Sequence, residues 1–114
     1  DVVREALDSV MRAAERRDDV EVVLVDNGST DGSYEVAREY VGRAVVHQMA
    51  GGISRLRNWG ARRGTGRWLA FLDSDVVVPP DFFDRMEALF RTGIAGAVGC
   101  ECHLPDRPVW HERI

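Results

Sequence analysis

The sequence contains no lysine, and all 15 of its basic residues are arginine. That absence excludes three kinds of chemistry. A phosphate-loop NTPase needs the lysine of its Walker motif, a Schiff-base enzyme needs a lysine amine, and a pyridoxal phosphate enzyme needs a lysine to hold its cofactor. Arginine still binds phosphates through its charged, forked guanidinium, so the chain keeps the ability to bind anions.

The sequence also has few cysteines, no long apolar run and no excess of positive charge. Cys100 and Cys102 are the only cysteines, and because residues so close rarely form an unstrained disulfide, we interpret them as reduced thiols. No apolar run approaches the roughly 20 residues of a membrane-spanning helix. We therefore expect a cytoplasmic location, or the cytoplasmic face of a membrane in a longer parent protein. The net charge of −4 argues against a nucleic-acid partner, which requires a basic face.

Helical periodicity and apolar runs alternate along the 114 residues. Residues 2–17 have apolar positions at helical spacing, and the continuous apolar run at 20–26 is typical of a strand in a parallel sheet. The alternation continues with expected helices at 34–41, 54–64 and 79–91 and expected strands at 44–47, 68–72 and 95–102. This order predicts an α/β fold, a Rossmann-like parallel sheet with helices on both faces.

Polar residues mark the ends of these elements. We expect Ser33 or Asp31 to cap the helix at 34–41, and Ser54 to cap the helix that follows it. Two of the apolar strands are each followed directly by an acid, Asp26 and Asp73. Ligands of doubly wound sheets bind beyond the carboxyl ends of the strands, so we expect both carboxylates to lie at the functional site.

The motif Asp73-Ser74-Asp75 carries the strongest chemical signal. In an extended segment, residues two apart project to the same side, so the two carboxylates can converge. Mg²⁺ and Mn²⁺ prefer oxygen ligands, and substrate phosphates commonly complete their coordination. The motif therefore predicts a divalent metal site, while the alternative, in which Asp75 caps a turn, also fits the spacing.

Two stretches carry three motifs that together resemble a known family. The stretches VEVVLVDNGSTDGS and GGISRLRNWGARRGTGRWLAFLDSDVVVPPDFF are similar to family 2 glycosyltransferases, which have the GT-A fold. The resemblance extends from about Val20 to Cys102, and residues 3–17 fit the helix that precedes it in the family. It implies transfer of a sugar, with inversion, from a nucleotide-diphosphate-sugar donor to an unknown acceptor. It also implies a divalent metal, Mg²⁺ or Mn²⁺.

The resemblance further implies roles for individual residues. The nucleotide would be bound by residues of three matched motifs, namely Asp26, Asn27, Gly28, Ser29, Arg57, Asn58, Asp73 and Ser74. Asp75, together with Asp73, would bind the metal. An acceptor at Asp26 or Asn27 suits the N–H of uracil or thymine, so a UDP- or dTDP-type donor is expected. Many relatives have two acids at that point, and the amide of Asn27 adds donors to its carbonyl acceptor, which leaves the base preference open.

The resemblance covers only part of the GT-A domain of this family. The family begins with a central strand before the helix at 3–17, and it continues into an acceptor-binding half that carries the catalytic base. Asp106 and Glu112 do not match that base. We therefore expect residues 1–114 to form a single partial GT-A domain that binds donor weakly and transfers nothing by itself. The strand at 20–26 would expose an edge, which allows a homodimer or a strand rearrangement.

Two alternatives remain open. LAFLDSDVVV also resembles the motif of haloacid-dehalogenase-type phosphohydrolases, with Asp73 as nucleophile and Asp75 as general acid. However, that motif usually opens its fold and is commonly accompanied by a lysine, whereas two strands precede it here. The second alternative is a nucleotide-binding fragment without catalytic activity. The three histidines, expected to be ordinary surface or strand-end residues, are His47, His103 and His111.

Overall fold

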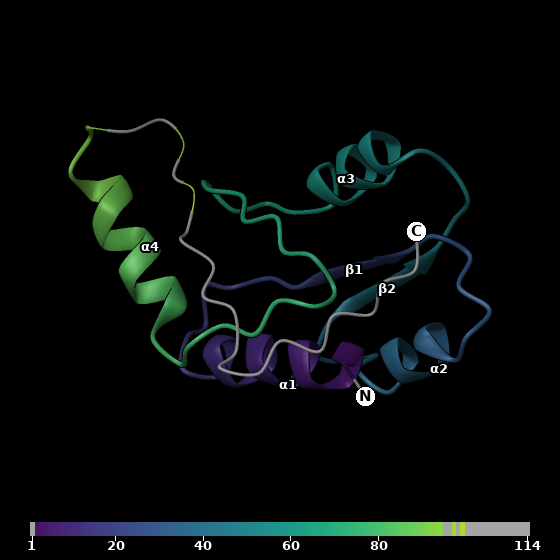
Figure 1. Cartoon of the computed structure of the whole chain (residues 1–114). Coiled ribbons are helices and arrows are strands. Elements are labelled where there is room, and N and C mark those ends of the chain that lie inside the picture. Colours follow the sequence, from purple (N-terminus) through teal and green to yellow (C-terminus); the bar gives the residue numbers. More distant parts are fainter. Residues whose placement is uncertain (1, 95–96, 98, 100–114) are drawn as a thin grey trace, which may run out of the picture.

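The computed structural model describes residues 2–94 together with Ala97 and Gly99. In this part of the chain the elements are α1 (Val2–Ala14), β1 (Val23–Asp26), α2 (Ser33–Arg38), β2 (Val45–Gln48), α3 (Ile53–Ala61) and α4 (Phe82–Arg91). β1 and β2 pair in parallel, with Asp26 opposite Gln48. α3 lies on one face of this sheet, and α1 and α2 lie on the other (Figure 1). The predicted α/β fold, with a parallel sheet and helices on both faces, is confirmed.

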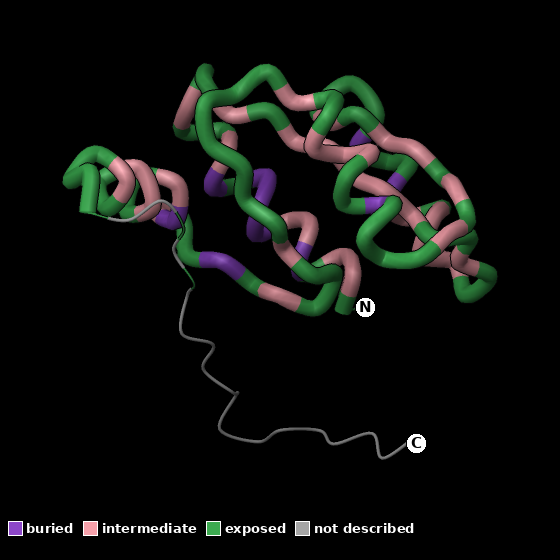
Figure 2. Tube along the Cα trace, turned by 90° about the horizontal axis from the view of Figure 1, so that it is seen from above, coloured by how far each residue is buried: buried purple, intermediate pink, exposed green. Residues whose placement is uncertain are grey.

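The core lies between α1 and the chain that leads into α4. Val10 and Ala13, three residues apart on one face of α1, are buried against Val78 and Phe82. We call these four residues the α1–α4 cluster. Figure 2 shows buried positions along α1 and near the start of α4, with a few others in and beside α2 and α3. The apolar contacts of α1 therefore hold residues that follow the acidic motif in the sequence.

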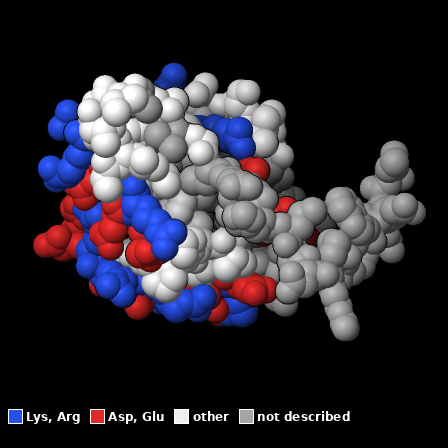
Figure 3. Space-filling view, turned by 60° about the vertical axis from the view of Figure 1, so that its left-hand side comes forward, with Lys and Arg blue, Asp and Glu red and all other residues white. Residues whose placement is uncertain are grey.

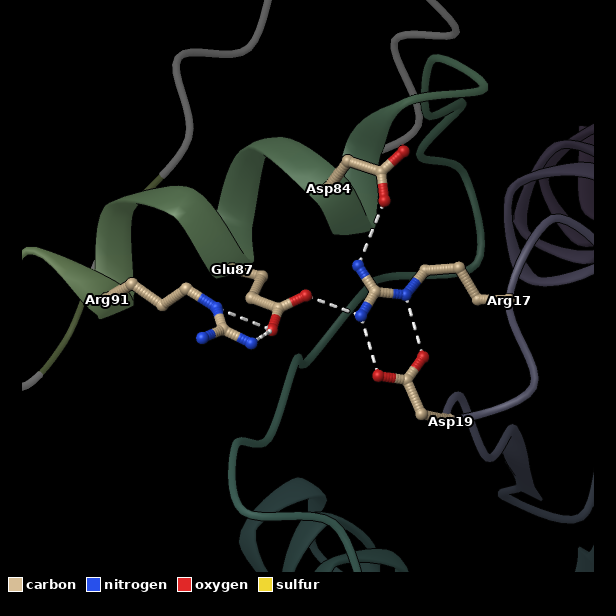
Figure 4. Close-up of polar contacts among 5 residues, drawn as sticks. All are labelled: Arg17, Asp19, Asp84, Glu87 and Arg91. Atoms are coloured by element: carbon tan, nitrogen blue, oxygen red, sulfur yellow. Dashed lines mark hydrogen bonds and ion pairs between the residues drawn. The ribbon is translucent and has the colours of Figure 1, made fainter.

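A charged network centred on Arg17 joins the end of α1 to α4 (Figure 4). The Arg17 guanidinium lies 2.9 Å from an oxygen of Asp84 and 2.5 Å from an oxygen of Glu87. It also donates two hydrogen bonds to the Asp19 carboxylate, and Glu87 accepts a further bond from Arg91. Figure 3 shows acidic and basic side chains interspersed on this side of the molecule, so the charges here neutralise one another.

This network should make the stability of the fold depend on pH. Hydrogen bonds from Arg17, and then from Arg91, hold the pKa of Glu87 below its ordinary value, and the bond from Arg17 does the same for the pKa of Asp19. A carboxyl group whose pKa is lowered in the folded state stabilises the fold at pH values above the pKa that it has in the unfolded chain. That stabilisation is lost as the pH falls through the pKa of the folded state. We expect the loss to begin below about pH 5.

An Arg17→Met variant should lose less stability as the pH falls, because Asp19 and Glu87 no longer receive the hydrogen bonds from Arg17 that lower their pKa values. Urea unfolding from neutral pH to about pH 3.5 measures the difference in unfolding free energy between parent and variant. We expect that difference to shrink toward zero in acid. Arg16→Met is the matched control, since Arg16 is exposed and makes no ion pair within the described residues. A difference that stays constant with pH would contradict this account.

Some predicted elements differ from the structure. The expected strand at 68–72 is irregular chain, in which Leu69 is 52% exposed and Phe71 is 55% exposed. A strand forms only where a neighbour completes its hydrogen bonds, and no strand of the described residues pairs with this segment. The expected cap Ser54 is also wrong, because α3 begins earlier, with Gly52 at the N-cap position. For α2 the N-cap is Gly32, and Asp31 accepts a hydrogen bond from the Ser33 N–H.

The remaining differences concern the ends of elements. α1 ends at Ala14 rather than at residue 17, and α2 ends at Arg38 rather than at residue 41. Apart from Ala97 and Gly99, the expected strand at 95–102 lies outside the described residues, as do Cys100, Cys102, His103, Asp106, His111 and Glu112. No helix within the described ranges is both long and apolar enough to cross a bilayer.

Candidate functional site

The first part of the site is the turn that follows β1. Asp26 ends the strand and accepts two hydrogen bonds at Oδ2, from the Ser29 backbone N–H at 2.9 Å and from Gln48 Nε2 at 2.8 Å. Gln48 is the residue opposite Asp26 in β2, so strand pairing itself brings this donor to the carboxylate. Gly28 has a φ of 70°, a backbone conformation that favours glycine, and this allows the chain to turn back onto Asp26.

These hydrogen bonds favour the ionised form of the Asp26 carboxyl group. Partial burial raises its pKa, but the bonds from Ser29 and Gln48 outweigh that effect and hold the pKa below its ordinary value. The next residue, Asn27, is exposed, and its Oδ1 accepts a hydrogen bond from the Gly51 N–H at 3.0 Å. The turn therefore presents hydrogen-bond acceptors in a fixed position, and Asn27 ties it to the loop before α3.

The second part of the site is α3, which the sheet holds through an aromatic contact. His47 of β2 and Trp59 of α3 stack with ring centroids 4.0 Å apart and nearly parallel planes. On the same helix, Arg57 Nη2 donates a hydrogen bond to Asp73 Oδ1 at 2.9 Å. The Arg57 guanidinium also lies 5.9 Å from the centre of the Phe71 ring. α3 thus presents a positive charge to the acidic motif.

The third part is the acidic motif itself, which forms a tight turn and not the extended segment expected from the sequence. The Val76 N–H bonds to the Asp73 carbonyl at 3.2 Å, and Asp73, Ser74 and Asp75 are all exposed. Leu72 before the turn and Val76 after it pack against the α1–α4 cluster. The core therefore holds the turn from both sides while its two carboxylates remain accessible.

α3 connects the two turns. The loop before α3 bonds to Asn27, and Arg57 within α3 bonds to Asp73. At a rise of 1.5 Å per residue, the five residues from the N-cap Gly52 to Arg57 span roughly 8 Å. No hydrogen bond joins the two turns directly within the part of the chain that the structure describes, and the Asn58, Ser74 and Asp75 side chains make none there.

The donor set of the acidic turn suits a divalent cation. Carboxylate oxygens are hard ligands, and Mg²⁺ typically takes one or two protein carboxylates while phosphates or waters complete its shell. Asp75 has an exposed carboxylate, and the Asp73 carboxylate bonds to Arg57 through Oδ1. Across the described ranges, no three or more His, Cys, Asp or Glu side chains group as a metal site. The set therefore fits a metal that shares its coordination with a phosphate ligand.

Two residues at this site were not predicted from the sequence. Gln48 supports Asp26, and Gly51 supports Asn27 through its backbone N–H. Gln48 lies one residue beyond the strand expected at 44–47, and a polar residue beside an expected strand end was the signal available for it. Gly51 contributes only backbone, so no side-chain pattern could identify it.

Comparisons with known proteins agree on one family. A profile described as Glycosyl transferase family 2 matches residues 1–111. The uncharacterized glycosyltransferase EpsJ of Bacillus subtilis is 33% identical over 102 aligned positions, which cover 86% of this chain and 29% of the relative. The putative glycosyltransferase EpsH of the same organism is 33% identical over 88 aligned positions, which cover 74% of this chain and 25% of EpsH.

A third relative is matched over almost the whole chain. The O-antigen biosynthesis protein RfbC of Myxococcus xanthus is 30% identical over 118 aligned positions, which cover 97% of this chain and 9% of RfbC. The chain therefore spans less than a third of the length of each of these relatives. No solved structure matches.

Proposed function

The chain belongs to glycosyl transferase family 2, and on that premise we propose that it binds the nucleotide-diphosphate part of a sugar donor. The observation that supports this proposal most is the connection that α3 makes between the turn at 26–29 and the acidic turn at 73–75. For the whole protein we propose transfer of the sugar to an acceptor, with inversion at the anomeric carbon. Because the chain belongs to this family, the alternative of a haloacid-dehalogenase-type phosphohydrolase is dropped.

We assign the nucleobase to the turn after β1. Uracil and thymine each have one N–H between two carbonyl groups. A site that binds them therefore needs a hydrogen-bond acceptor with hydrogen-bond donors beside it. Asp26 is an ionised acceptor whose Oδ2 is already bonded to Ser29 and Gln48, and we assign Oδ1 to the base N–H. Asn27 supplies amide N–H donors for a base carbonyl, since its Oδ1 accepts from Gly51. These assignments favour a UDP- or dTDP-type donor.

We assign the diphosphate to Arg57, Asn58 and the acidic turn. Arg57 uses one nitrogen on Asp73, and its guanidinium has further N–H donors that can bind phosphate oxygens. Asp75 and Asp73 would hold Mg²⁺ or Mn²⁺, which acts as a Lewis acid and neutralises charge on the leaving nucleoside diphosphate. Asn58 and Ser74 are exposed beside these groups and would donate hydrogen bonds to the nucleotide.

We propose that residues 1–114 act as one partial GT-A domain, which binds a donor without transferring its sugar. No described residue is assigned as the catalytic base, because each carboxylate of the site has a role in binding. The alternative of a purely nucleotide-binding fragment predicts the same behaviour for this chain. Within the described residues β1 bonds to β2 alone, so its other edge is open to a further strand, and we retain the homodimer through that edge as a proposal.

Calorimetric titration with UDP, in the presence of Mn²⁺ and in the presence of EDTA, tests the proposed function. We expect measurable binding with Mn²⁺ and weaker binding with EDTA, because the acidic turn alone repels the diphosphate. ADP is the matched control ligand, since it has the same diphosphate but a base that lacks the N–H between two carbonyls. Binding of neither nucleotide under either condition would contradict the proposal.

Replacing Arg57 with glutamine should weaken nucleotide binding while it changes stability little. Arg57 and Asp73 form an exposed ion pair, and such pairs contribute at most about 1 kcal/mol to the free energy of unfolding. A charged hydrogen bond to phosphate contributes about 1.5–3 kcal/mol, so UDP affinity should fall about tenfold or more. Arg62→Gln, an exposed arginine just after α3, is the control. Equal affinities of the two variants would contradict the role of Arg57.

A further inference from the structure

Ser9 is the one buried polar residue in the described part of the chain, with 1% of its surface exposed. Its hydroxyl donates to the Ala6 carbonyl at 2.7 Å and accepts from the Val78 backbone N–H at 3.0 Å. A buried hydroxyl on an apolar helix face is unfavourable unless it is hydrogen-bonded. The bonds to Ala6 and Val78 together satisfy this requirement, and the second joins α1 to a residue 69 positions further along the chain.

The segment that Ser9 holds follows the acidic turn directly. Val78 is buried and Val76 is partly buried against the α1–α4 cluster, whereas Val77 between them is 54% exposed. This alternation is that of an extended segment with one face on the core. A shift of one residue would bury Val77 in place of Val78 and would displace the acidic turn that ends at Val76.

Apolar packing by itself distinguishes poorly between the two registers, because residues 76, 77 and 78 are all valine. A hydrogen bond is directional, and Ser9 Oγ accepts from one particular amide, three residues after Asp75. We propose that Ser9 is a positioning residue, which sets the register of residues 76–78 on α1 and so aims the Asp73 and Asp75 carboxylates at a metal-bound nucleotide diphosphate. This inference rests on the proposed function.

The test measures Mn²⁺-dependent UDP affinity in a graded series at position 9. Ser9→Ala removes the acceptor, and Ser9→Cys replaces it with a weaker one of similar size. We expect affinity to fall about tenfold in Ser9→Ala, as for other residues that support metal ligands, with Ser9→Cys in between. The control is Met11→Ala, which truncates a buried side chain of α1 outside the α1–α4 cluster and keeps the Ser9 acceptor. Amide exchange of Val78 should become faster in Ser9→Ala and change less in Met11→Ala.

The possible outcomes separate the inference from the proposed function. If Ser9→Ala binds UDP within about twofold of the parent, the positioning role is wrong. The same conclusion follows if Met11→Ala loses as much affinity as Ser9→Ala, because general destabilisation then explains both. If Ser9→Ala does not fold, the Ser9→Cys variant provides the test. A Mn²⁺-dependent UDP affinity equal to that of the parent would then contradict the inference. If the parent itself shows no Mn²⁺-dependent UDP binding, the proposed function fails and the inference fails with it.

Discussion

Replacing Asp75 with asparagine should lower the affinity for UDP at least about tenfold when Mn²⁺ is present, as loss of a metal ligand does. The affinity in EDTA should not fall, because the variant removes a negative charge near the diphosphate. The substitution keeps the size of the side chain and exchanges a carboxylate for a weaker, neutral oxygen ligand. Calorimetry under both conditions separates the loss of metal binding from any change in nucleotide contact.

The surroundings of Asp75 make this variant interpretable. Its side chain is exposed and makes no hydrogen bond or ion pair within the described ranges, so stability should change by no more than about 0.5 kcal/mol. Asp73→Asn is less informative, because it also breaks the bond to Arg57. Asp18→Asn is the control, since it makes the same change of charge at another exposed acid. Equal Mn²⁺-dependent affinity in Asp75→Asn and Asp18→Asn would show that Asp75 is not a metal ligand.

Replacing Phe82 with alanine should produce the largest loss of stability. Phe82 is 7% exposed at the start of α4 and packs in the α1–α4 cluster. Truncation of a buried phenylalanine typically costs about 3–5 kcal/mol, and a small domain has only about 5–15 kcal/mol in total. We therefore expect the variant to be largely unfolded at 37 °C or to melt far below the parent. Urea unfolding followed by circular dichroism measures the change.

The same substitution connects stability to the site. Leu72 and Val76 hold the acidic turn on the cluster that Phe82 completes, so the turn should loosen when Phe82 is truncated. The control is Leu89→Ala on the same helix, where the side chain is 45% exposed and the cost should be at most about 1 kcal/mol. If Phe82→Ala were no more destabilising than Leu89→Ala, the cluster would not be the core that supports the turn.

Local sequence pattern predicts some elements of this fold well and others badly. α1 follows from apolar residues at helical spacing, and β1 and β2 follow from β-branched runs that end in polar residues. The helix expected after Pro79, Pro80 and Asp81 is α4, although it begins only at Phe82. The segment 68–72 has the same apolar character but is not a strand. Strand formation depends on a partner elsewhere in the chain, and the apolar run does not specify one. Helix ends were also inexact, because the last turn depends on local capping rather than on periodicity.

The candidate site shows the same limit. Asp26 and Asp73 could be located because each follows an apolar run, and the structure places Asp26 at the end of β1. The support from Gln48 depends on strand register, and the hold of Ser9 on Val78 depends on the packing of α1 against a distant segment. A serine among apolar positions of a helix was the available signal for Ser9, but its partner could not be read from the sequence. The ligand roles of these residues remain predictions.

The most direct test of the central claim is to locate bound Mn²⁺ by its paramagnetic broadening of backbone amide signals in NMR spectra. The spectra would be recorded on the parent chain with UDP and substoichiometric Mn²⁺, and Mg²⁺ would serve as the diamagnetic control. We predict the strongest broadening at residues 73–76, with weaker broadening at Arg57 and at residues 26–29, and we predict that UDP increases it. Broadening centred on the acidic residues around Arg17, or broadening that UDP does not change, would contradict a metal-dependent nucleotide site at the acidic turn.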